Sequence, residues 1–124
     1  MFVYSFEELD VWQLSREFTN DIYNLTSKYP KSELFGLTNQ MRRAAVSVSS
    51  NIAEGVSRKT NKEKARFTSI SFGSIIEILN QLIISRDLGF ITELELSELR
   101  SKIEGITHKI NNLYNAQIKD NTSQ

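Results

Sequence analysis

The chain has one side chain of the kind that most often performs acid–base or metal chemistry, the imidazole of His108, its only histidine. His108 stands between Thr107 and Lys109, where the apolar repeat of the surrounding residues turns it outward. No Glu-x-x-His pair occurs, so the di-iron carboxylate site of ferritin-like bundles is absent. No cysteine is present to supply a thiolate ligand. The sequence therefore predicts no metal site and a surface position for His108.

Hydroxyl nucleophiles are plentiful, but the sequence provides nothing to activate them. Ser47, Ser49 and Ser50 cluster, yet no histidine or suitable lysine stands within one helical turn to act as their base. Small residues in a helix more often permit close packing. Gly55 and Gly73 are isolated, so no glycine-rich phosphate loop precedes a helix. We expect no catalytic residue, no cofactor and no enzymatic activity.

Positive charge is concentrated in residues 42–66, although the whole chain has a net charge of zero. This segment has 7 basic and 2 acidic residues, a net of +5, against −3 for residues 1–41 and −2 for residues 67–124. Several of the cations fall in the first turns of a predicted helix, where the helix dipole disfavours them. They are either solvated surface charges or a site for phosphate groups, and we take the second as the prediction. The predicted nucleic-acid-binding residues are Arg42, Arg43, Arg58, Lys59, Lys62, Lys64 and Arg66.

The aromatic content of this segment decides what kind of contact to expect. Only Phe67 adjoins the cations, so stacking on bases is poorly supported. We expect contacts to the RNA or DNA backbone, with strong dependence on salt and little reading of sequence.

A second polar feature lies on one face of the helix predicted at residues 36–54. Arg43, Ser47, Ser50, Asn51 and Glu54 lie one turn apart, opposite an apolar face. Their mixture of charges, hydroxyls and an amide is typical of a hydrogen-bonded network. The alternatives are a solvated face and a buried polar contact to another subunit. The short side chains favour the subunit contact.

The elements that position these residues are four helices, predicted from apolar residues that recur every three or four positions. Ser5 with Glu8, and Thr92 with Glu95, are expected capping boxes. Gly89 is the expected end of the third helix. The predicted ranges are about 6–28, 36–54, 61–88 and 92–117, with a frayed tail at 119–124. Short connections make this an all-α, antiparallel up-down-up-down four-helix bundle, a single domain spanning residues 1–124.

The third predicted helix has an apolar face wider than one bundle seam requires. Its members are Phe72, Ile75, Ile76, Leu79, Leu82 and Ile83, with Ile78 at the margin. Such a face often has a subunit interface to bury, so we expect a homo-oligomer. No apolar run reaches the roughly 20 residues of a membrane span, and no signal peptide is recognised. We expect a cytoplasmic protein with no membrane partner, which the absence of cysteine fits.

Several segments together resemble a known family. They are FEELDVW at 6–12, YPKSE at 29–33, FGLT at 35–38, QMRRAAVS at 40–47, NIAEG at 51–55, and Gly73-Ser74 followed by Glu77. The chain resembles, over nearly its whole length, the four-helix-bundle family named for proteins encoded in intervening sequences of bacterial 23S rRNA genes, also labelled ribosomal-protein-like. The resemblance implies a left-handed bundle that assembles into a ring, a homopentamer.

The same resemblance extends to accessory proteins of diversity-generating retroelements, whose rings bind a reverse transcriptase and nucleic acid. It implies that Arg43, Asn51, Glu54 and Gly55 are signature residues, which we interpret, together with Ser47, as structural or interface residues. This chain departs from those accessory proteins in being neutral overall, whereas they have a basic surface. A protein-binding scaffold for a partner enzyme is therefore the alternative function.

Overall fold

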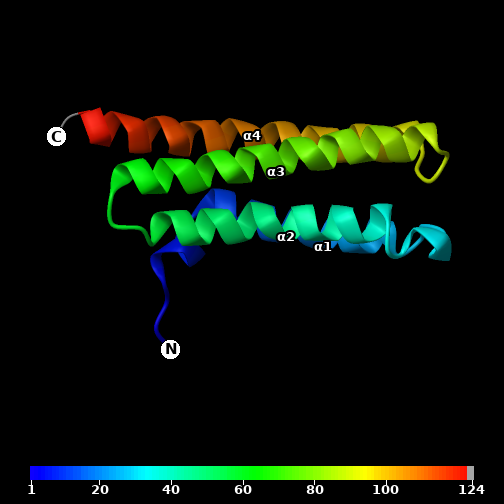
Figure 1. The fold of residues 1–124 in the computed structure, drawn as a ribbon, viewed down its shortest axis with the longest axis horizontal. Coiled ribbons are helices and arrows are strands. Elements are labelled where there is room, and N and C mark those ends of the chain that lie inside the picture. Colours follow the sequence, from blue (N-terminus) through cyan, green and yellow to red (C-terminus); the bar gives the residue numbers. More distant parts are fainter. Residues whose placement is uncertain (123–124) are drawn as a thin grey trace.

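The computed structural model describes residues 1–122, with side chains described through residue 119. Its elements are the 3₁₀ turn η1 (Ser5–Glu8), α1 (Asp10–Thr26), the 3₁₀ turn η2 (Lys31–Glu33), α2 (Leu37–Val56), α3 (Asn61–Asp87) and α4 (Glu93–Thr122). The four α-helices run alternately up and down with short connections between them (Figure 1). No strand occurs in this range. The predicted all-α, antiparallel four-helix bundle is confirmed.

The beginning of the chain differs from the predicted helix at residues 6–28. Leu9 is extended, with φ −74° and ψ 125°, and divides the turn η1 from α1. Leu9 is the N-cap of α1, because its carbonyl accepts the first helical hydrogen bond, from the Gln13 N–H at 3.1 Å. The predicted pairing of Ser5 with Glu8 is wrong. Instead, the Glu7 carboxylate reaches back to the Tyr4 N–H at 2.8 Å.

For the later helices, the predicted ends agree with the structure where nearby residues form a recognisable cap or turn. Thr92 and Glu95 form the predicted capping box, with reciprocal hydrogen bonds of 2.9 and 3.1 Å. Gly89, at φ +80°, follows α3 as expected. By contrast, α4 continues to Thr122, so the tail predicted at 119–124 is helical as far as it is described, and residues 123–124 lie outside the described range. Nothing after Gly105 breaks the helix, since no proline or glycine follows.

The core is formed by apolar side chains from all four helices. Its fully buried members include Ile22, Met41, Val48, Ile52, Ile75, Ile78, Leu82, Ile103 and Ile110. The prediction for Ile78 is wrong, because this side chain is 0% exposed while Ile76, placed on the apolar face, is 43% exposed. Helix α3 packs against both α2 and α4. Ile78 belongs to its buried stripe with Ile75 and Leu82, and Ile76 lies on its exposed side.

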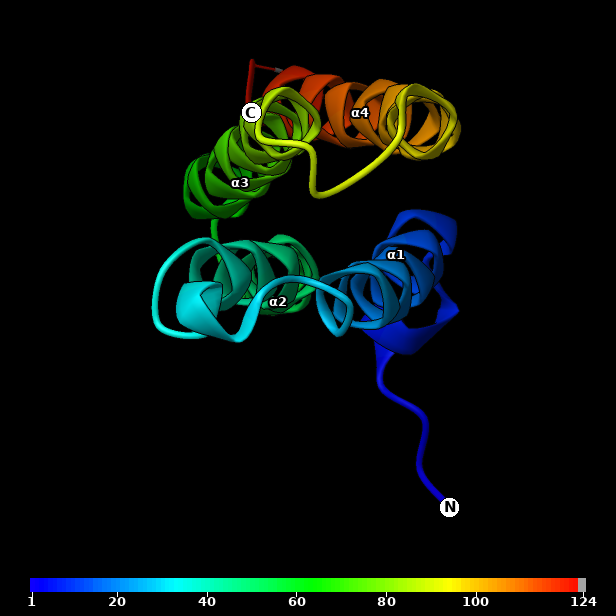
Figure 2. The ribbon, with the colours of Figure 1, turned by 90° about the vertical axis from the view of Figure 1, so that its right-hand side faces the viewer.

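The helices are packed unequally around this core. The end-on view shows α2 close to α3, and a wider separation between α1 and α4 (Figure 2). Hydroxyl groups join α2 to α3: the Ser71 hydroxyl donates to the Val48 carbonyl at 2.9 Å, and the Ser47 and Ser74 hydroxyls lie 2.8 Å apart. The α2–α3 pair is therefore the tight half of the bundle, and the α1–α4 pair is the open half.

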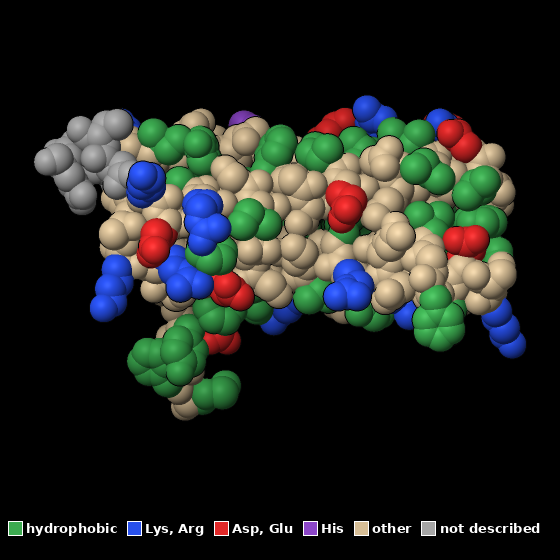
Figure 3. Space-filling model, viewed as in Figure 1, with side chains coloured by type: hydrophobic (Ala, Val, Ile, Leu, Met, Phe, Trp, Pro, Cys, Tyr) green, Lys and Arg blue, Asp and Glu red, His purple; other side chains and the backbone are tan. Residues whose placement is uncertain are grey.

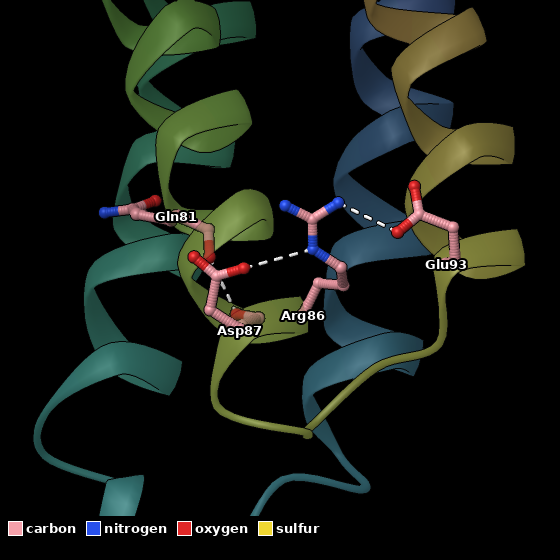
Figure 4. Close-up of polar contacts among 5 residues, drawn as sticks. Gln81, Arg86, Asp87 and Glu93 are labelled. Carbon is pink, nitrogen blue, oxygen red and sulfur yellow. Dashed lines mark hydrogen bonds and ion pairs between the residues drawn. The ribbon is translucent and has the colours of Figure 1, made fainter.

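The α3–α4 turn is fixed by charged side chains (Figure 4). The Arg86 guanidinium donates to the Asp87 carboxylate at 3.1 Å and to the Glu93 carboxylate at 2.8 Å. Hydrogen bonds to these two carboxylates raise the pKa of Arg86 above its ordinary value. Behind it, the Ser85 hydroxyl donates to the Gln81 carbonyl at 2.7 Å within α3. The helices on either side of this turn are thus tied at their junction.

Among the described residues, α3 is also the one helix long and apolar enough to cross a membrane by length and composition, with a mean hydropathy of 1.5 over its most apolar window. In the structure, its Ile75, Ile78 and Leu82 are fully buried and belong to the core shared with the other helices. The core helix of a bundle passes the same test, and 33% of this window is buried inside the structure.

Candidate nucleic-acid interface

Five of the predicted nucleic-acid-binding residues gather where α2 passes into α3. They are Arg58, Lys59, Lys62, Lys64 and Arg66, called here the basic cluster. Thr60 caps α3 at this point by accepting the Glu63 N–H at 3.2 Å, which places Lys62 and Lys64 in the first turn of the helix. The space-filling view shows basic side chains collected at this end of the molecule (Figure 3). These five residues therefore form one basic surface, and their binding of nucleic acid stays a prediction.

The guanidinium groups of Arg58 and Arg66 both stack on the ring of Phe67. This ring is 8% exposed and lies 4.4 Å from the Arg58 guanidinium carbon and 4.7 Å from that of Arg66. Stacking on an aromatic face is favourable for a guanidinium, but the two like charges repel each other. Arg58 is partly compensated by Glu54 at 3.5 Å, whereas Arg66 forms no ion pair within residues 1–119. The arrangement leaves net positive charge in fixed positions.

The three lysines of the cluster are available to a ligand. Lys59 and Lys62 are exposed and Lys64 is half-buried. None of the three forms an ion pair with another described residue, although Glu63 lies among them in sequence. A flexible ammonium group without a partner is suited to bind a phosphate oxygen as a point charge. The cluster can therefore hold anions without first breaking internal ion pairs.

Arg42 and Arg43 are not brought to the basic cluster. They lie about 20 Å from the end of α2, at 1.5 Å of helix per residue. Arg42 contacts α1: its Nε donates to the Thr26 hydroxyl at 2.9 Å, its Nη2 donates to the Tyr23 carbonyl at 3.4 Å, and its guanidinium lies over the Tyr23 ring. This cation stabilises the end of α1, where the helix dipole favours positive charge. Arg43 is exposed.

The polar face predicted on α2 divides into separate groups. The Asn51 amide donates to the Ser47 carbonyl at 2.8 Å and to its hydroxyl at 3.0 Å, and Ser47 contacts Ser74 of α3. Glu54 pairs with Arg58 and does not join this network. Ser47 and Asn51 thus have partners within the chain. The prediction that this face contacts another subunit stays open for Arg43 and Glu54.

Gly55, interpreted from the sequence as a structural or interface residue, lies against α3. The helix predicted at residues 36–54 continues past it to Val56. A Cβ atom at Gly55 would lie 3.0 Å from Phe67 Cβ and 3.3 Å from the Lys64 carbonyl oxygen. Both distances are shorter than most Cβ contacts in proteins, so a larger residue at this position would require α3 to shift by a few tenths of an ångström. Gly55 therefore sets the position of Phe67 and, through it, of the two stacked arginines.

Other predictions concern chemistry rather than binding. His108 is exposed on α4, as its place in the apolar repeat predicted. Within residues 1–119, no group of three or more His, Cys, Asp or Glu residues is arranged to hold a metal ion. The sequence reading also overlooked residues 1–4, which are exposed and apolar, including Phe2 and Tyr4. The signal was present as four successive apolar residues outside any predicted helix.

Comparisons with known proteins agree with the fold described above. A family model described as "23S rRNA-intervening sequence protein" matches residues 7–112. A crystal structure of a protein of unknown function from the S23 ribosomal protein family of Bacteroides thetaiotaomicron has the same fold, with a TM-score of 0.75 and 18% identity. The alignment covers 84% of this chain and 97% of that one. Comparison with curated proteins gives no match.

Proposed function

This chain belongs to the family of 23S rRNA-intervening sequence proteins, and from that premise we propose that it is a non-catalytic, oligomeric bundle that binds the RNA or DNA backbone. The observation that carries the proposal is the basic cluster, in which three lysines have no ion-pair partner among the described residues and two arginines are held on Phe67. In this proposal the protein acts in the cytoplasm and needs no cofactor.

The kind of contact follows from the composition of the cluster. Its one aromatic ring, Phe67, is buried and covered by guanidinium groups, so a base has no free face on which to stack. Binding is therefore electrostatic and directed at phosphates. Three to five phosphate contacts give a slope of log affinity against log salt of about −2.7 to −4.5 on duplex DNA.

The proposed assembly is a homo-oligomer. The family resemblance described in the sequence analysis implies that it is a pentameric ring. Exposed apolar side chains support self-association: Val46, Ile70, Ile76 and Ile84 are each between 40% and 43% exposed. Light scattering at several protein concentrations tests this part of the proposal, and a monomeric mass throughout would remove it.

The alternative is a scaffold that presents a surface to a partner enzyme such as a reverse transcriptase, without direct contact to nucleic acid. The net charge of zero favours this alternative, because proteins that depend on nucleic-acid binding are commonly basic overall. The lysines of the basic cluster bind nucleic acid in the first function and have no such role in the second. Variants of these lysines therefore distinguish the two functions.

The test is the salt dependence of binding to labelled RNA and DNA, followed by fluorescence anisotropy. Binding should be detectable at low salt and should weaken steeply as salt rises. The triple variant Lys59→Glu, Lys62→Glu, Lys64→Glu should abolish it. The matched control is Lys28→Glu, Lys31→Glu, Arg100→Glu, which changes the charge equally at exposed positions away from the cluster.

The possible results discriminate between the two functions. Equal loss in the triple variant and its control would show that only net charge matters, and would remove the basic cluster as a site. Undetectable binding by the native protein at low salt would favour the scaffold. Native mass spectrometry of protein purified without nuclease then reports the number of chains and any nucleic acid retained.

A further inference from the structure

A groove borders the basic cluster where the start of α3 lies beside the end of α4 (Figure 1). It has a volume of about 400 Å³. Lys62 and Arg66, both members of the basic cluster, line it from α3, and Tyr114 lines it from α4. Ala65 and Ile118 add apolar surface between them. This surface is called here the Tyr114 groove, and it combines cations with an aromatic ring.

The ring of Tyr114 has no stacking partner within the protein. Tyr114 is half-buried, and among the described residues no other ring and no cation stacks on it. Phe67 differs, because it is 8% exposed and the guanidinium groups of Arg58 and Arg66 cover its ring. The free aromatic ring that the basic cluster itself lacks is therefore supplied by α4.

The charge around the Tyr114 groove is positive. Lys62 and Arg66 form no ion pair with another described residue. Glu63 is the one acidic residue of the lining, so two positive charges and one negative charge give a net of +1. Lys62, Arg66 and the exposed Ser69 follow at spacings of four and three residues, which places them along one face of α3 over about 10 Å. The groove thus attracts an anionic ligand longer than a single phosphate.

A second hollow brings arginines and a tyrosine together, and the comparison shows what distinguishes the Tyr114 groove. That hollow is lined by Tyr23, Arg42 and Arg43, between α1 and α2. There the Arg42 guanidinium already lies 4.7 Å from the Tyr23 ring and donates to the Thr26 hydroxyl. A base could stack on that face of the ring only by displacing this cation. Tyr114 requires no such displacement.

We infer that the Tyr114 groove binds an unpaired base of single-stranded RNA or DNA, with the base stacked on Tyr114 and the adjoining phosphates bound by Lys62 and Arg66. Every base has a π-face, so stacking of this kind adds affinity without reading sequence. A base in a duplex is already stacked and paired, so the groove favours single strands. This inference rests on the proposed function, and it specifies the form of nucleic acid that the same surface binds.

The test compares two labelled strands of equal length and charge, a thymidine oligonucleotide and an abasic oligonucleotide. The native protein should bind the thymidine strand roughly 5- to 150-fold more tightly, the contribution of one base stacked on an aromatic side chain. Tyr114→Leu keeps apolar volume without a ring and should bind the two strands equally. Tyr114→Phe keeps the ring and should retain the preference. Tyr23→Leu is the matched control on α1 and should also retain it.

The dependence on salt separates stacking from charge. The slope of log affinity against log salt counts the phosphates bound, so it should be the same for the native protein and for Tyr114→Leu. The same variant should leave the affinity for duplex DNA unchanged, because a paired base does not enter the groove. Thermal unfolding followed by circular dichroism shows whether each variant is folded.

A crosslinking measurement on the native protein requires no variant. A single strand that contains 5-bromouracil is irradiated with the protein, and the complex is digested with trypsin. Cleavage after Lys109 and Lys119 releases residues 110–119, in which Tyr114 is the one aromatic residue. Mass spectrometry should find the nucleotide attached to this peptide.

The outcomes separate this inference from the proposed function. Equal binding of the thymidine and abasic strands by the native protein, or crosslinks confined to other peptides, overturns the inference and leaves phosphate binding by the basic cluster intact. A preference lost in Tyr23→Leu and retained in Tyr114→Leu would place the base between α1 and α2 and would refute the groove. If the native protein binds neither strand at low salt, the proposed binding of nucleic acid fails as well.

Discussion

Replacing Gly55 by alanine tests the close approach of α2 and α3 on which the position of the basic cluster depends. The added Cβ would meet Phe67 Cβ at 3.0 Å and the backbone oxygen of Lys64 at 3.3 Å. Neither atom is the flexible end of a side chain, so the backbone of α2 or α3 must shift by a few tenths of an ångström. Overpacking of this kind costs about 1–3 kcal/mol. Alanine returns up to about 1 kcal/mol in helix propensity, and less near a helix end.

The expected net effect is a loss of about 1–2 kcal/mol in the free energy of unfolding, from the difference of these two terms. With an unfolding entropy of about 2.1 cal/mol/K per residue, the whole chain loses about 4 °C in Tm for each kcal/mol. Gly55→Ala should therefore lower Tm by about 4–8 °C. Urea denaturation followed by circular dichroism measures the free energy, at one fixed protein concentration because self-association stabilises the folded state.

Gly73→Ala is the matched control, because it makes the same chemical change in a helix where the Cβ meets nothing within 4 Å. It should stabilise the protein by about 0.5–1 kcal/mol, since alanine restricts the unfolded chain and favours the helix. Opposite signs for the two variants support the packing role of Gly55. If Gly55→Ala is as stable as Gly73→Ala, the steric reasoning is refuted, and with it the account of how Phe67 is placed.

Three further changes test individual contacts. Tyr29→Phe should cost little at neutral pH, because the buried Tyr29 hydroxyl forms no hydrogen bond of ordinary geometry. Burial raises the pKa of Tyr29 above 10.0, the nearby Ser85 hydroxyl opposes this shift, and the charge of Glu95 adds to it. The unfolded chain therefore loses this proton first, so native stability should fall as pH rises above about 10, and fall less in the variant, as urea titrations at several pH values would show. Thr92→Ala removes the capping box of α4 and should cost about 1 kcal/mol by urea denaturation, whereas Thr92→Ser should restore most of it. Arg42→Ala should destabilise the chain by about 1–2 kcal/mol, because the Arg42 guanidinium is bound to α1. RNA binding, measured by fluorescence anisotropy, should be unchanged. A loss of binding without a loss of stability would instead show that Arg42 belongs to the nucleic-acid site.

The features predicted correctly from the sequence are those set by neighbouring residues. Apolar residues at helical intervals correctly predicted four helices and most of the core. They form one apolar face on each helix, and burial of that face is what stabilises a helix in a protein. The Thr92–Glu95 cap and the Gly89 terminus depend on contacts over three or four residues. The boundary at Leu9 was missed, because Glu7 and Glu8 are equivalent in sequence and only the backbone geometry decides which one reaches back.

What the tertiary structure alone decided is which distant residues meet. The seven basic residues form one segment in sequence, but the length of α2 separates Arg42 and Arg43 from the other five, and α1 binds Arg42. Ile78 and Ile76 exchange their predicted places because the rotation of α3 is set by its contact with α2. Gly55 against Phe67, and the groove between α3 and α4, likewise depend on how closely each pair of helices approaches. An apolar period determines that a face is buried, but helix separation and rotation arise from side chains fitting between helices, and these contacts are not local in the sequence.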